Sequence, residues 1–203
     1  MRILHLFSAN LFTGAVEHAL ELALWQQAQG HIVLLASDYA SPPNELPHHH
    51  IVVHGSCGAQ RGRSAQSLRM LLIQEDIRLV HCHSRAASAI AFKALKGINT
   101  AQVSTVHGRQ GIHYTSVNFD VYGQQIIAVS QLLKTHLVED LRKKEQKISV
   151  IANGLNFTPP INGSGSQRIS LIGRLSGPKG TQASRLFRDV FPSLLRAFPQ
   201  LIV

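Results

Sequence analysis

The sequence predicts an α/β fold in which a parallel β-sheet carries helices on both faces. Two observations support this prediction. Short apolar runs alternate with longer amphipathic segments along most of the chain, and polar or glycine-rich residues follow several of the apolar runs. Strands that alternate with helices of this length are typical of βαβ units, which build parallel sheets.

The predicted strands share a core of Ile, Val, Leu, Ala and Phe. In chain order they are residues 2–7, 31–36, a short run at 51–53, 77–82, 101–106, 125–129 and 147–152. The Asn153-Gly154 pair after the last strand indicates a turn. Ligands bind parallel sheets at the carboxyl ends of the strands, so the loops after these runs are where a site is expected.

The predicted helices are residues 14–29, 64–74, 84–96 and 130–143. Gly30 is a plausible stop for the first, and Ser84 and Ser130 are suitable N-caps for the last two. Residues 38–50 are polar and proline-rich, which indicates a loop, and residues 55–62 form a glycine-rich loop.

Composition excludes several classes of protein. The chain has 203 residues, 44% of them hydrophobic, and no run reaches the roughly 18 apolar residues that a membrane span needs. The first ten residues are interpreted as a strand and not as a signal peptide. Cys57 and Cys82 form no C-x-x-C pair, so we expect free thiols and a cytoplasmic protein.

The net charge of +9 limits the choice of partners. Basic residues are not interleaved with aromatic ones and no nucleic-acid motif occurs, so nucleic acid is not expected. Phosphorylated ligands or an anionic membrane surface on the inner face of the membrane are favoured, and the alternative is charge that serves only solubility. The candidate membrane contacts are Arg61, Arg63, Arg69, Arg142, Lys143, Lys144 and Lys147.

The composition changes after residue 155. Residues 156–167 are rich in Pro, Gly, Ser and Asn and indicate a linker between a first domain, residues 1–155, and a second, residues 168–203. The sequence of this second domain predicts a strand at 168–172, a helix at about 181–198 and the start of a strand at 201. These elements are too few to close a core, so we expect further chain after Val203 or packing on the first domain.

Four groups of residues are candidates for chemistry. The first is the loop 8–14, in which Gly14 lets backbone approach a ligand at a helix N-terminus. It contains no G-x-G-x-x-G pattern, so a dinucleotide is disfavoured. The second is the pair His81 and His83, which share a strand face. No third metal ligand has an evident spacing, so we expect one histidine to be structural and the other to line the cleft, and the run His48–His50 to be solvated.

The third and fourth groups follow apolar runs. His107 directly follows the predicted strand at 101–106 and has flanking glycines, and imidazole can accept a proton near neutral pH. Arg109 beside it can hold a phosphate or carboxylate; the alternative is a loop without a role. Arg174 and Lys179 lie in a glycine-rich segment that suits a diphosphate but is not a P-loop; the alternative is a basic surface turn.

These segments, in this order, resemble the retaining GT-B glycosyltransferases of family 4. The matching segments are TGAVEH (13–18), GHIV (30–33), LVHCHS (79–84), STVHG (104–108), IIAVS (126–130), KISVIANG (147–154), IGRL (172–175) and KG (179–180). The resemblance implies two Rossmann-like domains facing a cleft, an acceptor-side N-terminal domain and a nucleotide-sugar-binding C-terminal domain, with no metal or other cofactor.

The resemblance also implies roles for residues. His107 falls on the family's cleft histidine, which would be catalytic, and Gly14, Arg174 and Lys179 fall on donor-binding positions. The candidate acceptor-binding residues are Ser84, Arg85 and Arg109. The acceptor would be a glycan or a lipid-linked molecule in cell-surface polysaccharide, lipopolysaccharide or glycolipid synthesis.

Two departures from the family pattern matter. Thr13 stands where the family often has a first glycine, and the pair of glutamates that holds donor sugar and ribose would lie beyond Val203. We therefore expect this chain to be incomplete and inactive alone. The alternatives are a nucleotide-sugar epimerase of the same fold, and a non-catalytic remnant that binds acceptor or membrane.

Overall fold

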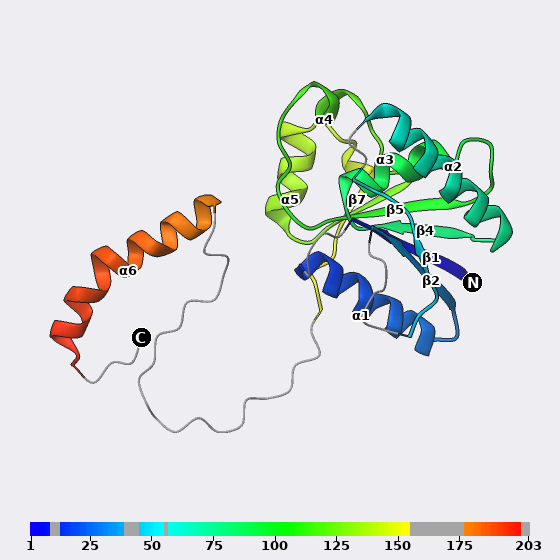
Figure 1. Cartoon of the computed structure of the whole chain (residues 1–203). Helices are drawn as coiled ribbons and strands as arrows, with labels where there is room; N and C mark the ends of the chain where they lie inside the picture. The colour runs from blue at the N-terminus through cyan, green and yellow to red at the C-terminus, as the bar shows by residue number, and fades with distance from the viewer. Residues whose placement is uncertain (9–12, 39–44, 55–56, 155–176, 200–203) are drawn as a thin grey trace. The chain divides into compact units, whose positions relative to one another are not determined.

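The computed structural model describes residues 1–8, 13–38, 45–54, 57–154 and 177–199. The chain divides into two units, Met1–Gly154 and Leu155–Val203 (Figure 1). The first unit contains all of the described strands. The second contributes one described helix.

The first unit is a Rossmann-like α/β domain built on a seven-stranded sheet in the order β3-β2-β1-β4-β5-β6-β7. All six neighbouring pairs are parallel. The strands are β1 (Arg2–Phe7), β2 (Ile32–Ser37), β3 (His48–His50), β4 (Leu79–Cys82), β5 (Ala101–Val106), β6 (Gln125–Ala128) and β7 (Ile148–Val150). The order reverses at β1, between β2 and β4. The predicted fold class is confirmed.

Helices cover both faces of this sheet. They are α1 (Gly14–Ala28), α2 (Gly58–Gln74), α3 (Arg85–Ala94), α4 (Tyr114–Asn118), α5 (Gln131–Thr135), the π-helix η1 (His136–Asp140) and the 3₁₀-helix η2 (Glu145–Lys147). Figure 1 shows α1 on one face of the sheet and α2 and α3 on the other.

Alternating residues of β1 build these two layers. Leu4 and Leu6 pack into the cluster under α2 and α3, whereas Phe7 packs against α1. Because side chains alternate along a strand, His5 shares the α1 face with Phe7. This alternation decides which helix can contact the buried histidine.

Three predictions about elements need correction, and one helix was missed. The short strand is His48–His50 and not residues 51–53, and it pairs with β2, so its histidines lie on an edge strand with side chains that are exposed or half-buried. Helix α2 begins at Gly58, inside the predicted glycine-rich loop, where the amide of Arg61 donates to the carbonyl of Cys57. The helix predicted for 130–143 changes to π geometry at His136. Helix α4 was not predicted.

In the second unit, α6 spans Gly177–Ala197 and continues through Pro192. It starts before the predicted residue 181, because Pro178 is tolerated in the first turn of a helix. The predicted linker, the strand at 168–172 and the strand start at 201 lie outside the described residues.

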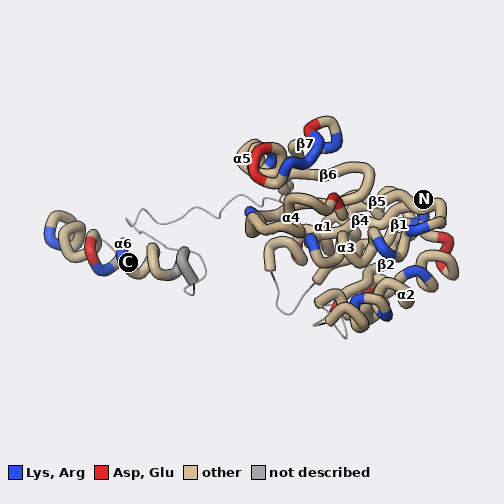
Figure 2. The backbone as a smooth tube through the Cα atoms, turned by 90° about the horizontal axis from the view of Figure 1, so that it is seen from above, with Lys and Arg blue, Asp and Glu red and all other residues tan. Residues whose placement is uncertain are grey.

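Charged residues are spread over several elements of both units. Figure 2 shows Lys and Arg on α2, beside α5 and β7, and on α6, with Asp and Glu between them. Within the described part of the chain, no helix has both the length and the apolar character needed to cross a membrane.

Candidate functional site

Histidines from four segments meet at the carboxyl edge of the sheet, near the point where the strand order reverses. In the parallel register His5 of β1 lies beside His81 of β4. His83 follows the end of β4, and His107 follows the end of β5. His18 comes from the second turn of α1. Such a reversal point is where open α/β sheets bind ligands.

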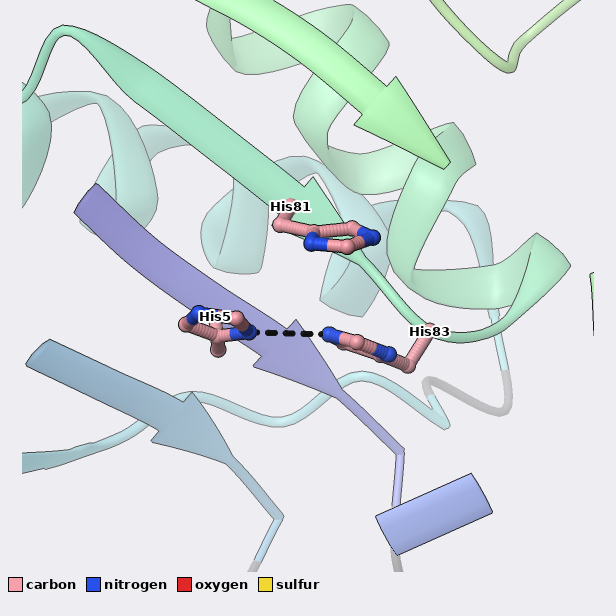
Figure 3. Close-up of side chains that lie close together, drawn as sticks. All are labelled: His5, His81 and His83. Carbon is pink, nitrogen blue, oxygen red and sulfur yellow. Dashed lines mark hydrogen bonds between the residues drawn. The ribbon is translucent and has the colours of Figure 1, made fainter. Parts of the chain in front are cut away.

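A chain of hydrogen bonds orders the rings of this cluster. His5 Nε2 lies 2.8 Å from the side-chain oxygen of Gln26, which can only accept, so Nε2 donates. A neutral His5 then accepts at Nδ1 from His83 Nε2, 2.9 Å away (Figure 3). His83 is left with a lone pair on Nδ1, which points to the ring of His107.

His81 is held separately. Its Nε2 lies 2.7 Å from the hydroxyl of Thr105, and its ring stacks on that of His83 with centroids 4.3 Å apart. Both histidines of the predicted pair are buried. Of the two, His83 contacts the half-buried rings of His18 and His107.

His107 follows His83 in this series of rings, and one of its two ring nitrogens makes no hydrogen bond to a described residue. Its Nε2 is 3.5 Å from His83 Nδ1, and its ring is 5.1 Å from that of His18, centroid to centroid. Its Nδ1 is buried and has no hydrogen-bond partner among the described residues. A buried polar atom without a partner is costly, so it indicates a position that a ligand group can complete.

Burial keeps the cluster neutral. Desolvation lowers the pKa of His107 to about 4, with a smaller effect from His18. Desolvation also lowers the pKa of His5 to about 4 and that of His81 to about 3, and it lowers the pKa of His83 well below its usual value. At pH 7 the site therefore offers neutral imidazoles with lone pairs.

Gly14 begins α1 as predicted, after Thr13 in an extended conformation. A Cβ added at Gly14 would meet no described atom within 4 Å. The described structure therefore does not itself require glycine at this position.

The acceptor candidates differ in their contacts. Ser84 caps α3 by accepting from the amide of Ala87 at 3.1 Å, and its hydroxyl also accepts from Ser8. Arg85 donates to the carbonyl of Thr115 at 2.7 Å, while its buried Nε has no partner in the described part of the chain. Arg85 also lines a surface pocket of about 270 Å³ with Arg61 and His54.

Arg109 is turned to another partner. Its guanidinium lies 3.2 Å from the carboxylate of Asp140, which also accepts from His136 Nδ1 at 2.6 Å. The other nitrogen of His136 accepts from the amide of Gln110. This group fixes the loop after β5 on η1. This group was not predicted, although His136 and Asp140 are four residues apart in a predicted helix.

Of the candidate membrane contacts, three are engaged within the first unit. Lys143 is buried and donates to the carbonyls of Val117 and Phe119. Lys147 binds Asp120, and Arg69 binds the carbonyls of Ala94 and Lys96. Local sequence could not show that these cations tie loops and helices together.

The two donor-side cations belong to the second unit. Arg174 lies outside the described residues. Lys179 lies at the start of α6 and not in a loop before it. The structure thus brings His107 together with His83 and His18, and leaves the predicted diphosphate contacts untested.

Comparison with known proteins gives one family and one fold. The protein-family model described as Glycosyltransferase Family 4 matches residues 12–158. No curated protein sequence matches the chain. A glycosyltransferase from Rickettsia africae ESF-5 matches with a TM-score of 0.73 at 22% identity, over 89% of this chain and 55% of that one.

Two further solved structures are similar. The lipopolysaccharide outer core galactosyltransferase WaaB in its apo form has a TM-score of 0.65 at 14% identity, over 93% of this chain and 57% of that one. Anabaena Alr3699/HepE in complex with UDP-glucose has a TM-score of 0.62 at 15% identity, over 91% and 49%. The chain spans about half the length of these structures.

Proposed function

This chain belongs to glycosyltransferase family 4, and on that premise we propose that it supplies the acceptor-side half of a two-domain glycosyltransferase. The enzyme moves a sugar from a nucleotide-sugar donor to a glycan or lipid-linked acceptor. Family membership supports the class of reaction, and the solved relatives support the Rossmann-like fold of this half.

The observation that carries the proposal is the unpartnered nitrogen of His107. In the absence of ligand, His107 Nε2 faces the lone pair of His83 Nδ1, so Nε2 carries the proton and Nδ1 is free to accept. A hydroxyl of the transferred sugar or of the acceptor is the group that would complete Nδ1. The low pKa of His107 keeps that lone pair available at neutral pH.

The donor side of the proposal rests on charge. The leaving nucleoside diphosphate gains negative charge as the glycosidic bond breaks, and cations already in place stabilise that charge most in the transition state. Arg174 and Lys179 are proposed for this role, and Gly14 for close backbone approach. Anabaena Alr3699/HepE was solved with UDP and with UDP-glucose, which supports a nucleotide sugar as the donor class.

The acceptor side rests on Arg85. Its buried Nε is an unused donor beside the carboxyl end of β4, and the adjacent pocket also contains Arg61. Two guanidinium groups suit an anionic acceptor, because Arg binds phosphate and carboxylate through paired N–H groups. A phosphorylated glycolipid at the inner membrane face fits this chemistry, and Ser84 and Arg109 remain proposed contacts to it.

The test compares this chain with a completed chain, in which residues 1–203 are joined to the remainder of the donor domain of the Rickettsia africae relative. We expect the completed chain to release nucleoside diphosphate from nucleotide sugars when glycan or glycolipid acceptors are present. The 203-residue chain should release little or none.

Two results would contradict the proposal. One is a 203-residue chain that turns over as well as the completed chain. The other is a completed chain that folds and binds nucleoside diphosphate but transfers no sugar to any acceptor of the stated classes.

A further inference from the structure

We infer that His18, His83 and His107 form a binding site for a borderline transition-metal ion, with Zn²⁺ as the best match. Neither family membership nor the proposed function assigns such a site. The three residues come from α1, from the end of β4 and from the end of β5, so only the folded sheet brings them together.

The first argument is distance. One ring nitrogen from each of the three residues can be chosen so that all three lie within 4.8 Å of one another. His83 Nδ1 and His107 Nε2 are 3.5 Å apart, which is long for a hydrogen bond. Two nitrogens bonded at about 2.1 Å to one tetrahedral Zn²⁺ are separated by about 3.4 Å. The observed separation is therefore close to that of two ligands of one Zn²⁺ ion.

The second argument is the orientation of His83. Histidines that bind a metal nearly always donate their other N–H to a neighbouring acceptor, which fixes the tautomer. His83 Nε2 donates to His5 Nδ1, and His5 in turn donates to Gln26. This support leaves the lone pair of His83 Nδ1 directed at His107. The depressed pKa of each of the three rings means that no proton must be removed from an imidazolium at pH 7.

The deeper group of His5, His81 and His83 is less suitable for an ion, although its nitrogens also lie within 4.8 Å of one another. His5 Nδ1 and His83 Nε2 are separated by an ordinary hydrogen-bond distance of 2.9 Å. Both nitrogens of His5 are engaged, and all three rings are buried. His18 and His107 are only half-buried, so an ion can reach them from solvent.

Binding at this site changes His107 without changing its charge. The ion bonds to Nε2, the proton on that nitrogen passes to solvent, and Nδ1 takes up a proton from solvent. Three histidines and one open position are the arrangement found in open zinc sites, where water or an anion completes the shell. With the ion bound, His107 Nδ1 would donate to a sugar hydroxyl and could no longer accept from it.

The test uses Co²⁺ as a probe with the whole 203-residue chain, purified in the presence of a chelator that is then removed. Four-coordinate Co²⁺ absorbs visible light much more strongly than hexaaqua Co²⁺, so binding and geometry are read together. We expect a four-coordinate band that Zn²⁺ displaces. His18→Gln and His107→Gln should each weaken binding at least tenfold, and Gln26→Leu should weaken it about tenfold through His5 and His83.

The matched control is the double substitution His49→Gln and His50→Gln on the edge strand β3, which removes two of the more exposed histidines. This variant should keep the band, and circular dichroism should show that all variants remain folded. Survival of the band in both His18→Gln and His107→Gln would overturn the inference, as would its loss in the control. Because no transfer reaction is measured, the result is independent of the proposed function.

Discussion

At the residue scale, the buried neutral histidines set how the protein responds to acid. In the unfolded chain each imidazole regains a pKa of about 6.5. In the folded chain the pKa of His5 is about 4 and that of His81 about 3, because burial penalises the charged form. Between about pH 4 and pH 6.5 the unfolded chain therefore binds protons at these two histidines that the folded chain does not, so the free energy of unfolding rises with pH.

We therefore predict that the free energy of unfolding is highest above pH 6.5 and falls as the pH is lowered toward 4. Each pKa unit corresponds to about 1.4 kcal/mol, so the loss should amount to several kcal/mol. Urea denaturation at pH 7.5 and pH 5, with a chelator present, measures it. His5→Asn should flatten the pH dependence and His49→Gln should not. Equal stability of the unchanged protein at both pH values would contradict the prediction.

A substitution at Gly14 should affect donor binding and leave stability nearly unchanged. Its Cβ position is open among the described residues, and alanine is favoured in the first turn of a helix. We predict that Gly14→Ala changes the free energy of unfolding by less than about 0.5 kcal/mol. In the completed chain the same substitution should raise the KM for the nucleotide sugar. An unchanged KM would remove Gly14 from the donor contacts.

The sequence predicted those residue roles that depend on near neighbours. Ser84 and Ser130 cap the next helices through amides three residues away, as expected. His5 and His18 were missed, because the register of the parallel strands and the placement of α1 bring them into the cluster. No local spacing carries that information.

At the element scale, the strand predictions succeeded for strands inside the sheet. The bounds of β1 and β5 agree with the sequence analysis residue for residue. Strand β3 failed because an edge strand of three histidines has no apolar pattern. The π-helix η1 was missed because its geometry depends on tertiary contacts of His136 with the loop after β5.

The turn before β6 gives the sharpest stability prediction for an element. Gly123 has φ +86°, and a Cβ there would lie 2.6 Å from the backbone oxygen of Gln102. Gly30 has a similar φ of +82° but open space around it. We predict that Gly30→Ala costs about 1–2 kcal/mol, from conformation alone, and that Gly123→Ala costs clearly more.

Thermal and urea denaturation of the two alanine variants, side by side, measure this difference. The comparison isolates the contact with Gln102, because the backbone conformation is shared. Equal destabilisation of the two variants would show that the turn relaxes without cost and that the contact is unimportant.

At the scale of the whole molecule, the sequence predicted the fold class and the family, because the order of several weak segments is specific where each one alone is not. The predicted catalytic His107 lies at the carboxyl edge of the sheet beside the point of strand reversal. The donor half could not be tested in the same way. Arg174 lies outside the described residues, and this chain covers 55% and 49% of the two solved relatives.

The role proposed for His107 is tested by measuring turnover and product binding separately in the completed chain. His107→Ala should lower turnover on the order of a hundredfold, the typical cost of losing a placed polar group. It should leave the affinity for the nucleoside diphosphate product nearly unchanged, because His107 is proposed to contact the sugar or the acceptor. Arg174→Ala and Lys179→Ala should lower turnover and also weaken product binding.

Steady-state kinetics and titration calorimetry with nucleoside diphosphate give both quantities for each variant, with His49→Ala as the control that should change neither. We expect a defect in turnover alone for the His107 variant, and a defect in both turnover and product binding for the two cation variants. Full activity of His107→Ala, or normal product binding by both cation variants, would show that these residues do not have the proposed roles and would leave only a shared fold.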